Sequence, residues 1–269
     1  MRRVRTIPRL QRRARNAHKG EFGTVVICAG SATMPGAAIL CARGALRGGA
    51  GLVRVALPSA LLAPCLAAVP AATGLLRAAG AAHCVQGATA IVIGPGLGAT
   101  PATRRLVRAV LRAATAPLVL DADALNVLAP LRGPLRVRAG AVLTPHPGEA
   151  ARLLASSSAA VQRDRERAAH ELARRSGQTV VLKGAGTLVC AGERIYTNRS
   201  GNPGMATGGS GDVLAGLLGA LLAQGLEPFA AACLAVYVHG RAGDLVARRL
   251  SEAGLCAEDL PPAIAEVLR

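Results

Sequence analysis

The chain has 269 residues, of which 51% are hydrophobic, and a formal net charge of +17. This length and apolar content suffice for one large core or two modest ones, and no apolar run is long enough for a membrane span. With two Tyr, two Phe and no Trp, there are few rings to stack on bases, so we expect neither a nucleic-acid nor a membrane partner.

The first residues of the chain are strongly basic. Seven arginines and Lys19 precede the first acidic residue, Glu21. We therefore predict a basic, flexible N-terminal arm over residues 1–17 and a single domain over residues 18–269. A transit peptide is an alternative, although such leaders are usually rich in Ser. A secretory signal is not expected, because no apolar run precedes residue 24.

The seven cysteines are widely spaced and form no CxxC pair. Most lie in apolar surroundings, which favours buried free thiols over disulfides or a metal site. Free thiols are typical of a reducing compartment, so we expect a cytoplasmic protein.

In chain order, short β-rich runs alternate with longer runs rich in Ala and Leu. The predicted strands are 24–29, 52–56, 90–93, 117–120, 141–143 and 179–182, followed by a hairpin of 187–190 and 194–197 around Gly192. Helices are predicted at 36–47 and 101–113, after residues 120 and 143, and through the last third. Continuous apolar strands separated by helices indicate an α/β fold, a three-layer αβα sandwich around a mostly parallel sheet.

Glycine-rich or polar turns follow five of the predicted strands. They are Cys28–Ser31, Gly94–Gly98, Asp121–Asn126, Thr144–Glu149 and Lys183–Thr187. Ligands of open parallel sheets collect beyond the carboxyl ends of the strands, so we expect the functional site at this edge.

The Gly94–Ala99 segment also fits the G-x-G-x-x-A fingerprint of dinucleotide-binding folds, with Asp121 ending the next strand. However, Thr100 and Pro101 are typical of a helix N-cap and first helical position. They would leave the glycines in a loop before the helix, so this interpretation is the less favoured one.

The segment Asn202–Ala223 joins a glycine-dense half to an apolar, helix-forming half. Its backbone amides from Gly208 to Gly211, namely Gly208, Gly209, Ser210 and Gly211, are expected to bind phosphate at a helix start. Asp212 is the only ionisable residue there, and we interpret it as a general base that accepts a proton from an attacking hydroxyl. The alternative is a simple helix N-cap, which would not require the four glycines that precede it.

Only two of the 32 cationic residues are lysine, at positions 19 and 183. In so arginine-rich a chain, a lysine suggests a site that needs a compact ammonium, although two lysines could also remain by chance. Lys183 follows a strand and could reach a nucleotide phosphate.

His146 and Glu149, which follow the 141–143 strand, are further candidates for site residues. Glu149 lies one turn into a helix, where it could hold a water-coordinated Mg²⁺ against phosphates or complement the helix dipole. His146 is expected to contact a ligand rather than a metal, because no second His or Cys lies at metal-binding spacing.

Six blocks in this order resemble the ADP-dependent (S)-NAD(P)H-hydrate dehydratase family of the ribokinase-like superfamily. They are GTVVICAGSATMPGAAILCARGALRGGAGLV, IVIGPGLG, PLVLDADALN, VLTPHPGEAARLL, VVLKGAGTLV and NPGMATGGSGDVLAGLLGALL. The resemblance covers about residues 18–268, and the six blocks together are far more specific than any one.

This resemblance implies a carbon–oxygen lyase that repairs the (6S) hydrate of NADH or NADPH, with ADP or ATP as co-substrate and Mg²⁺ present. Asp212 would take the proton from the C6 hydroxyl. Ala37, Gly96 and His146 would contact the hydrate, and Gly211 would bind the nucleotide. The segment Lys183, Gly184, Ala185, Gly186 and Thr187 would bind the nucleotide as well. We also expect a homo-oligomer, favouring a tetramer, and a separate NAD(P)H-hydrate epimerase as pathway partner.

The sequence departs from the family at two places. Met34 replaces a frequent Tyr, and His146–Glu149 stands where related kinases show Asn-x-x-Glu, so a metal role for Glu149 is a hypothesis. Two other functions stay open: a kinase of the same fold acting on a small hydroxyalkyl heterocycle, and a non-enzymatic nucleotide- or RNA-binding module that uses the basic arm.

Overall fold

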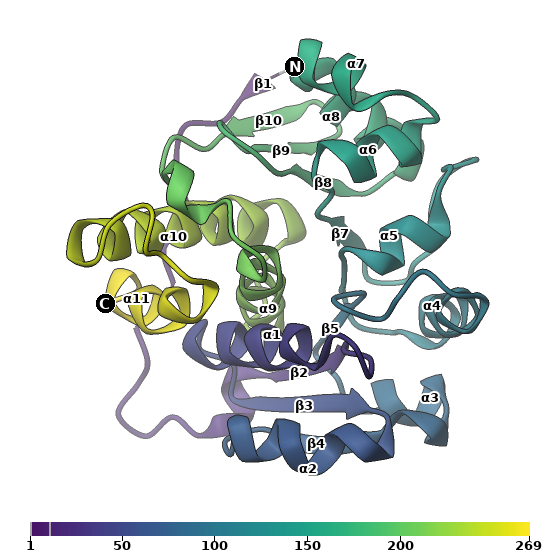
Figure 1. Cartoon of the computed structure of the whole chain (residues 1–269), viewed down its shortest axis with the longest axis vertical. Coiled ribbons are helices and arrows are strands. Elements are labelled where there is room, and N and C mark those ends of the chain that lie inside the picture. Colours follow the sequence, from purple (N-terminus) through teal and green to yellow (C-terminus); the bar gives the residue numbers. More distant parts are fainter. Residues whose placement is uncertain (1, 11) are drawn as a thin grey trace.

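The computed structural model describes residues 2–10 and 12–269, which form one ten-stranded sheet with helices on both faces (Figure 1). The strands are β1 (Arg2–Arg3), β2 (Thr24–Cys28), β3 (Leu52–Leu57), β4 (Thr73–Leu76), β5 (Ala90–Ile93), β6 (Leu118–Leu120), β7 (Ala141–Leu143), β8 (Thr179–Leu182), β9 (Leu188–Ala191) and β10 (Arg194–Thr197). Their spatial order is β1-β10-β9-β8-β7-β6-β5-β2-β3-β4. Neighbouring strands are parallel except where β9 pairs with β8 and β10.

The α-helices are α1 (Pro35–Arg47), α2 (Ser59–Ala68), α3 (Ala81–Val85), α4 (Pro101–Ala113), α5 (Asp123–Leu128), α6 (Pro147–Leu154), α7 (Ser158–Arg163), α8 (Arg165–Ser176), α9 (Ser210–Ala223), α10 (Pro228–Arg249) and α11 (Leu260–Val267). Short 3₁₀ helices are η1 (Lys19–Phe22), η2 (Arg77–Ala79), η3 (Pro203–Met205) and η4 (Ala257–Asp259). The predicted three-layer αβα fold with a mostly parallel sheet is confirmed. Within the described residues, no helix has the length and apolarity needed to cross a bilayer.

Strand alternation builds a separate core on each face of the sheet. Val25 and Ile27 of β2 pack into the core that contains α1, α9 and α10, whereas Val26 and Cys28 pack into the core that contains α4, α6 and α8. Because side chains alternate along a strand, continuous apolar strands bury residues on both faces. Figure 1 shows α1, α9, α10 and α11 on one side of the sheet and α4, α5 and α6 on the other.

Two glycines bring α1 and α9 close together. A Cβ at Gly44 would collide with the backbone of Val213, and one at Gly216 would collide with the backbone of Cys41. Small residues permit this close approach, which fixes the first turns of α9 against the middle of α1.

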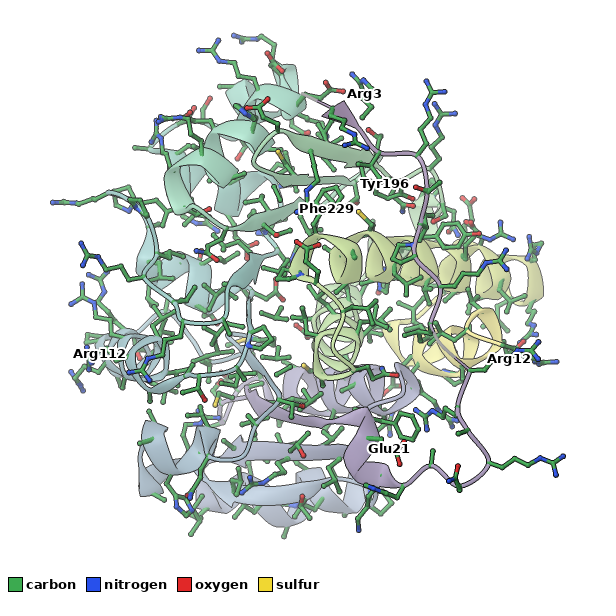
Figure 2. All side chains as sticks on the ribbon, turned by 180° about the vertical axis from the view of Figure 1, so that it is seen from behind. Arg3, Arg12, Glu21, Arg112, Tyr196 and Phe229 are labelled. Atoms are coloured by element: carbon green, nitrogen blue, oxygen red, sulfur yellow. The ribbon has the colours of Figure 1, made fainter. Side chains whose placement is uncertain are left out.

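The N-terminal arm lies along the outside of the domain, from β1 past α10 to η1 (Figure 2). Val4, Ile7 and Leu10 pack against the core on the α10 side, and the Arg13 guanidinium lies 3.7 Å from the centroid of the Phe22 ring. These side chains of the predicted basic arm therefore lie against the domain. That the arm moves stays a prediction, and its residues Met1 and Gln11 lie outside the described part of the chain.

Candidate active site

Five adjacent parallel strands end at one edge of the sheet, in the order β8, β7, β6, β5, β2. The turns that follow them are the five turns singled out in the sequence. The chain order reverses between β5 and β2, since β3 and β4 extend away on the far side of β2. Such a switch point leaves a crevice for a ligand at the carboxyl ends of the strands.

Gly96 and Ala37 meet at this switch point. Gly96 follows β5 with a φ of 61°, and a Cβ built on it would lie 2.7 Å from the Cβ of Ala37 and 2.9 Å from the Met34 carbonyl oxygen. The structure therefore brings together two of the predicted hydrate contacts. It also excludes the dinucleotide-binding interpretation of Gly94–Ala99. Thr100 caps α4 by accepting the Thr103 N–H at 3.1 Å, so the glycines precede the helix.

The start of α9 offers unused backbone N–H groups. Within Gly208–Asp212, only the N–H of Ser210 donates to another described residue, to the Thr207 carbonyl at 3.4 Å. Gly209 is the N-cap, with a φ of 90° that favours glycine, and its missing side chain leaves room for Leu40 and Ala257. Free amides at the positive end of a helix are suited to bind an anion.

Asp212 is the third residue of α9, so the simple N-cap alternative is wrong. Its carboxylate makes no hydrogen bond or ion pair with the described residues, although it is largely shielded from water. Burial raises its pKa from 3.8 to about 7, the charge of Asp121 adds to this rise, and Lys183 opposes it. A carboxylate with a pKa near 7 that is free of partners is suited to accept a proton.

Lys183 links this helix start to two buried carboxylates. Its Nζ lies 2.8 Å from Asp121 Oδ1 and 3.9 Å from Glu149 Oε2. A Cβ built on Gly211 would lie 3.4 Å from the same nitrogen, which places the ammonium beside the start of α9. Burial lowers the pKa of Lys183, but the two carboxylates outweigh it and the net pKa lies above its ordinary value.

Asp121 and Asp123 are site residues to which the sequence assigned no role. Asp121 is buried and accepts the Thr144 hydroxyl at 2.7 Å as well as the Lys183 ammonium. Asp123 accepts the backbone N–H of Gly98 at 2.7 Å, which ties the β5 turn to the β6 turn. Between them Ala122 has a φ of 47°, a conformation that is costly for a residue with a Cβ. This strain is visible only in the structure, so no signal in the sequence indicated the roles of these two aspartates.

The predicted nucleotide loop, Lys183–Thr187, turns sharply after β8. Gly184 and Gly186 have φ values of 128° and 63°, and the Thr187 hydroxyl donates to the Gly184 carbonyl at 2.8 Å. Residues 184–186 are exposed, so their backbone is accessible to a ligand. Arg165 supports the loop by donating to the Lys183 carbonyl at 3.2 Å, a contact that the sequence gave no reason to expect.

His146 and Glu149 form a capping box at the start of α6. His146 Nδ1 accepts the Gly148 N–H at 3.0 Å, and Glu149 Oε2 accepts the His146 N–H at 2.8 Å. Burial raises the pKa of Glu149, and burial lowers that of His146. The imidazole is half exposed and can still meet a ligand, so its hydrate contact stays a prediction.

The only arrangement in which the described residues fit a magnesium ion is one with few protein ligands. Within the described residues, no group of three or more His, Cys, Asp or Glu side chains is placed to hold a metal. Glu149 keeps acceptor capacity on Oε1, which lies 3.5 Å from His146 Nε2. Since Mg²⁺ commonly takes one or two carboxylates plus phosphates and water, Glu149 fits as a carboxylate that acts through water.

His239 is a further residue that the sequence did not single out. It is buried on α10, and its Nε2 lies 3.0 Å from the carbonyl oxygen of Ser210 in the first turn of α9. Burial lowers its pKa to about 4, so the ring is neutral at pH 7 and donates from Nε2. The contact holds the start of α9 against α10.

Comparison with known proteins gives a consistent result. A family model described as NAD(P)H-hydrate dehydratase matches residues 25–265. The chain is 43% identical over 262 residues to an ADP-dependent (S)-NAD(P)H-hydrate dehydratase from Neisseria meningitidis, covering 93% of this chain and 86% of that one. It spans about half the length of bifunctional NAD(P)H-hydrate repair enzymes from Moorella thermoacetica, Coxiella burnetii and Escherichia coli.

Solved structures agree with these relatives. An ADP/ATP-dependent NAD(P)H-hydrate dehydratase from Bacillus subtilis, co-crystallised with ATP and Mg²⁺, superposes with a TM-score of 0.88 at 33% identity, covering 96% of this chain and 93% of that one. A ribokinase-like superfamily protein from Enterococcus faecalis superposes with a TM-score of 0.86 at 28% identity, covering 96% and 90%. The expected ribokinase-like fold is thereby confirmed.

Proposed function

The chain belongs to the NAD(P)H-hydrate dehydratase family, and we propose that it catalyses the ADP-dependent dehydration of the (6S) hydrate of NADH or NADPH. One observation carries this proposal at the level of the site. The unpartnered carboxylate of Asp212 stands beside the backbone N–H groups of Gly208, Gly209 and Gly211, which donate to no described residue. Base and anion cradle are therefore adjacent, as phosphoryl transfer to a hydroxyl requires.

The mechanism begins with the hydrate held against the surface that Ala37 and Gly96 form together at the switch point. Asp212 accepts the proton of the C6 hydroxyl. The hydroxyl oxygen attacks the terminal phosphorus of ADP, and the bond from that phosphorus to the oxygen of the leaving AMP breaks. The phosphoester at C6 is then a good leaving group. The ring nitrogen supplies its electron pair, the C–O bond breaks, and phosphate departs. The departing phosphate accepts the neighbouring C5 proton, which restores the dihydronicotinamide ring, so the sum is hydrate plus ADP to cofactor, AMP and phosphate.

The nucleotide side of the site rests on two segments. We place the ADP phosphates against the amides of Gly208–Gly211 and the exposed loop Lys183–Thr187, because both present backbone to the same edge. The Lys183 ammonium supplies a positive charge beside the start of α9. When bound, Mg²⁺ would neutralise phosphate charge, with Glu149 holding it through water.

The test is to incubate the protein with NADH hydrate, ADP and Mg²⁺ and to follow absorbance of the restored dihydronicotinamide together with released phosphate. We expect one phosphate for each cofactor restored. A phosphorylated product that retains its phosphate would favour the kinase alternative instead. Recovery without any nucleotide would contradict the ADP-dependent proposal.

A pair of variants isolates the base. Asp212→Asn should lower kcat by about 10²–10⁴-fold, since this is the usual contribution of a general base. Asp164→Asn is the matched control, because it makes the same change in charge at the N-cap of α8, where Asn also caps well. If Asp212→Asn and Asp164→Asn had equal activity, Asp212 would not be the base.

The proposed function extends to the assembly of the protein, its compartment and its pathway partner. We propose a cytoplasmic homo-oligomer, with a tetramer favoured, and an NAD(P)H-hydrate epimerase as pathway partner. Six of the seven cysteines are buried free thiols, which suits a reducing compartment. Relatives of about twice the length are bifunctional repair enzymes, which supports a functional link to a second repair activity.

A further inference from the structure

A second cavity lies outside the candidate active site, between the N-terminal arm and the end of β10. Its volume is about 490 Å³, which is within the usual range for small-molecule sites. Figure 2 shows Tyr196 of β10 beside the first residues of the arm. On the opposite side, Tyr237 of α10 contributes to the wall.

The arm wall of this cavity is held in place by several contacts. β1 pairs in parallel with β10, and the backbone N–H of Val4 donates to the Ile195 carbonyl at 2.8 Å. Arg3 donates to both carboxylate oxygens of Glu166 at 2.9 Å. Val4 and Ile7 also pack against the core, so the wall is part of the fold.

The cavity is positively charged, and no carboxylate is among the described residues that line it. Three arginines contribute to it. Arg3 is neutralised by Glu166, but Arg5 and Arg199 form no ion pair with the described residues. One guanidinium group can donate two parallel hydrogen bonds to the oxygens of a phosphate. Several guanidinium groups around one concave space therefore favour an anion with more than one phosphate.

Hydroxyl groups complete the lining. Ser200 Oγ donates to the Tyr237 carbonyl at 3.0 Å, and the Tyr196 hydroxyl donates to Asn198 Oδ1 at 3.4 Å. The Tyr237 hydroxyl, in contrast, has no hydrogen-bond partner among the described residues and is available to bind a ligand. Guanidinium N–H and phenolic O–H groups are both donors, and phosphate oxygens accept hydrogen bonds.

From this arrangement we propose that the cavity between the arm and β10 binds a polyphosphate anion, either inorganic or carried by a nucleotide. The site is separate from the amides and carboxylate of α9. It is nevertheless connected to the nucleotide loop, because the N–H of Asn198 donates to the Thr187 carbonyl at 2.8 Å. The arm thus has a binding role rather than a purely solvated one.

The chain offers a specific probe of this cavity. It contains only two tyrosines and no tryptophan, and both tyrosines line the cavity. Intrinsic emission therefore reports on this location. We would titrate the full chain with inorganic tripolyphosphate, which does not absorb in the tyrosine band, and expect a saturable change in emission.

Variants assign the response. The double variant Arg5→Ala/Arg199→Ala should weaken tripolyphosphate binding about tenfold or more, since two charge-assisted contacts are lost. The matched control is Arg112→Ala, an exposed arginine on the other edge of the molecule in Figure 2, which should bind as the parent does. No saturable change, or an undiminished change in the double variant, overturns the proposal. So does a change that is lost in a Lys183→Met protein that is still folded, which would assign the change to the active site.

Calorimetric titration with ADP then distinguishes the two sources of phosphate. If a nucleotide is the ligand, the parent chain should bind two ADP molecules and the double variant one. If inorganic polyphosphate is the ligand, both proteins should bind one ADP while the tripolyphosphate response still depends on Arg5 and Arg199. Either result supports an anion site in this cavity.

Discussion

The starts of α6 and α9 look alike in sequence and differ in chemistry. Each carries an acidic residue at its third position, Glu149 in α6 and Asp212 in α9, and each lies beside Lys183. Glu149 accepts the N–H of its own N-cap at 2.8 Å, whereas Asp212 accepts no hydrogen bond from the described residues. The position in the helix therefore does not decide the role. The hydrogen bond back to the N-cap distinguishes them, because it engages the Glu149 carboxylate and leaves that of Asp212 available for the base role that we propose.

A third helix start supports this distinction. His18 and Glu21 at η1 repeat the His-x-x-Glu pattern of His146 and Glu149, and they form the same capping box. η1 precedes β2, whereas the site turns follow the strands at their carboxyl ends. The pattern is thus a structural device of this chain, and a metal role for Glu149 has to rest on its location rather than on the motif.

The largest expected effect comes from removing the cation that the two helix starts share. Lys183→Met should lower the free energy of unfolding by about 3–5 kcal/mol, because Asp121 and Glu149 would stay buried without their partner. Chemical denaturation at pH 7 measures it. Lys19→Met, at the only other lysine, is the matched control and should change stability by less than about 0.5 kcal/mol since Lys19 is exposed. Equal effects would contradict a shared buried cation.

The pH dependence of activity sharpens the comparison next. Asp212 must be ionised to accept a proton, so kcat/KM should rise about tenfold per pH unit below pH 7 and level off above it. Glu149→Gln should move the midpoint to lower pH, because the charge of Glu149 contributes to the raised pKa of Asp212. Steady-state rates from pH 5 to 9 test both statements. A midpoint near pH 4 would show that Asp212 is not the group that titrates.

The same pKa has an opposite consequence for stability. An aspartate whose pKa is about 7 when folded and 3.8 when unfolded holds its proton more tightly in the folded state. Its contribution to stability is therefore present below pH 3.8 and is lost as the pH rises through 7. Asp212→Asn should make the protein more stable than the parent by about 1–3 kcal/mol at pH 8, with little difference near pH 4. Denaturation curves at both pH values measure this, and a variant that is less stable at pH 8 would contradict it.

Much of the fold could be predicted from local signals. Thr100 and Pro101 set the first residue of α4, and continuous apolar runs marked β5, β7 and β8 with their observed bounds. Other elements had no such signal. α2 carries Pro64 in its interior, and the edge strand β4 contains a glycine and has no fully buried residue. β1 forms only because a distant strand, β10, offers it an edge.

The candidate site divides in the same way. Glycine spacing and the single carboxylate made Asp212 and the amides around it candidates from the sequence, because these lie within one short segment. The pairing of Lys183 with Asp121 joins residues 62 positions apart, and it exists because β6, β7 and β8 are neighbours in the sheet. Strand order is a property of the whole fold, so the role of Asp121 could not be predicted from the turn that contains it.

The smallest effect tests the structural half of the comparison. Glu149→Ala removes the capping box of α6 and should cost about 0.5–2 kcal/mol, whereas Glu149→Gln can keep the hydrogen bond to the His146 N–H and should cost less. The pair Glu21→Ala and Glu21→Gln makes the same changes at η1, where the glutamate is about half exposed, so both costs should be smaller. Denaturation of the four variants gives these values. If Glu149→Gln were as costly as Glu149→Ala, the negative charge of Glu149 toward Lys183, rather than the cap, would be its structural contribution.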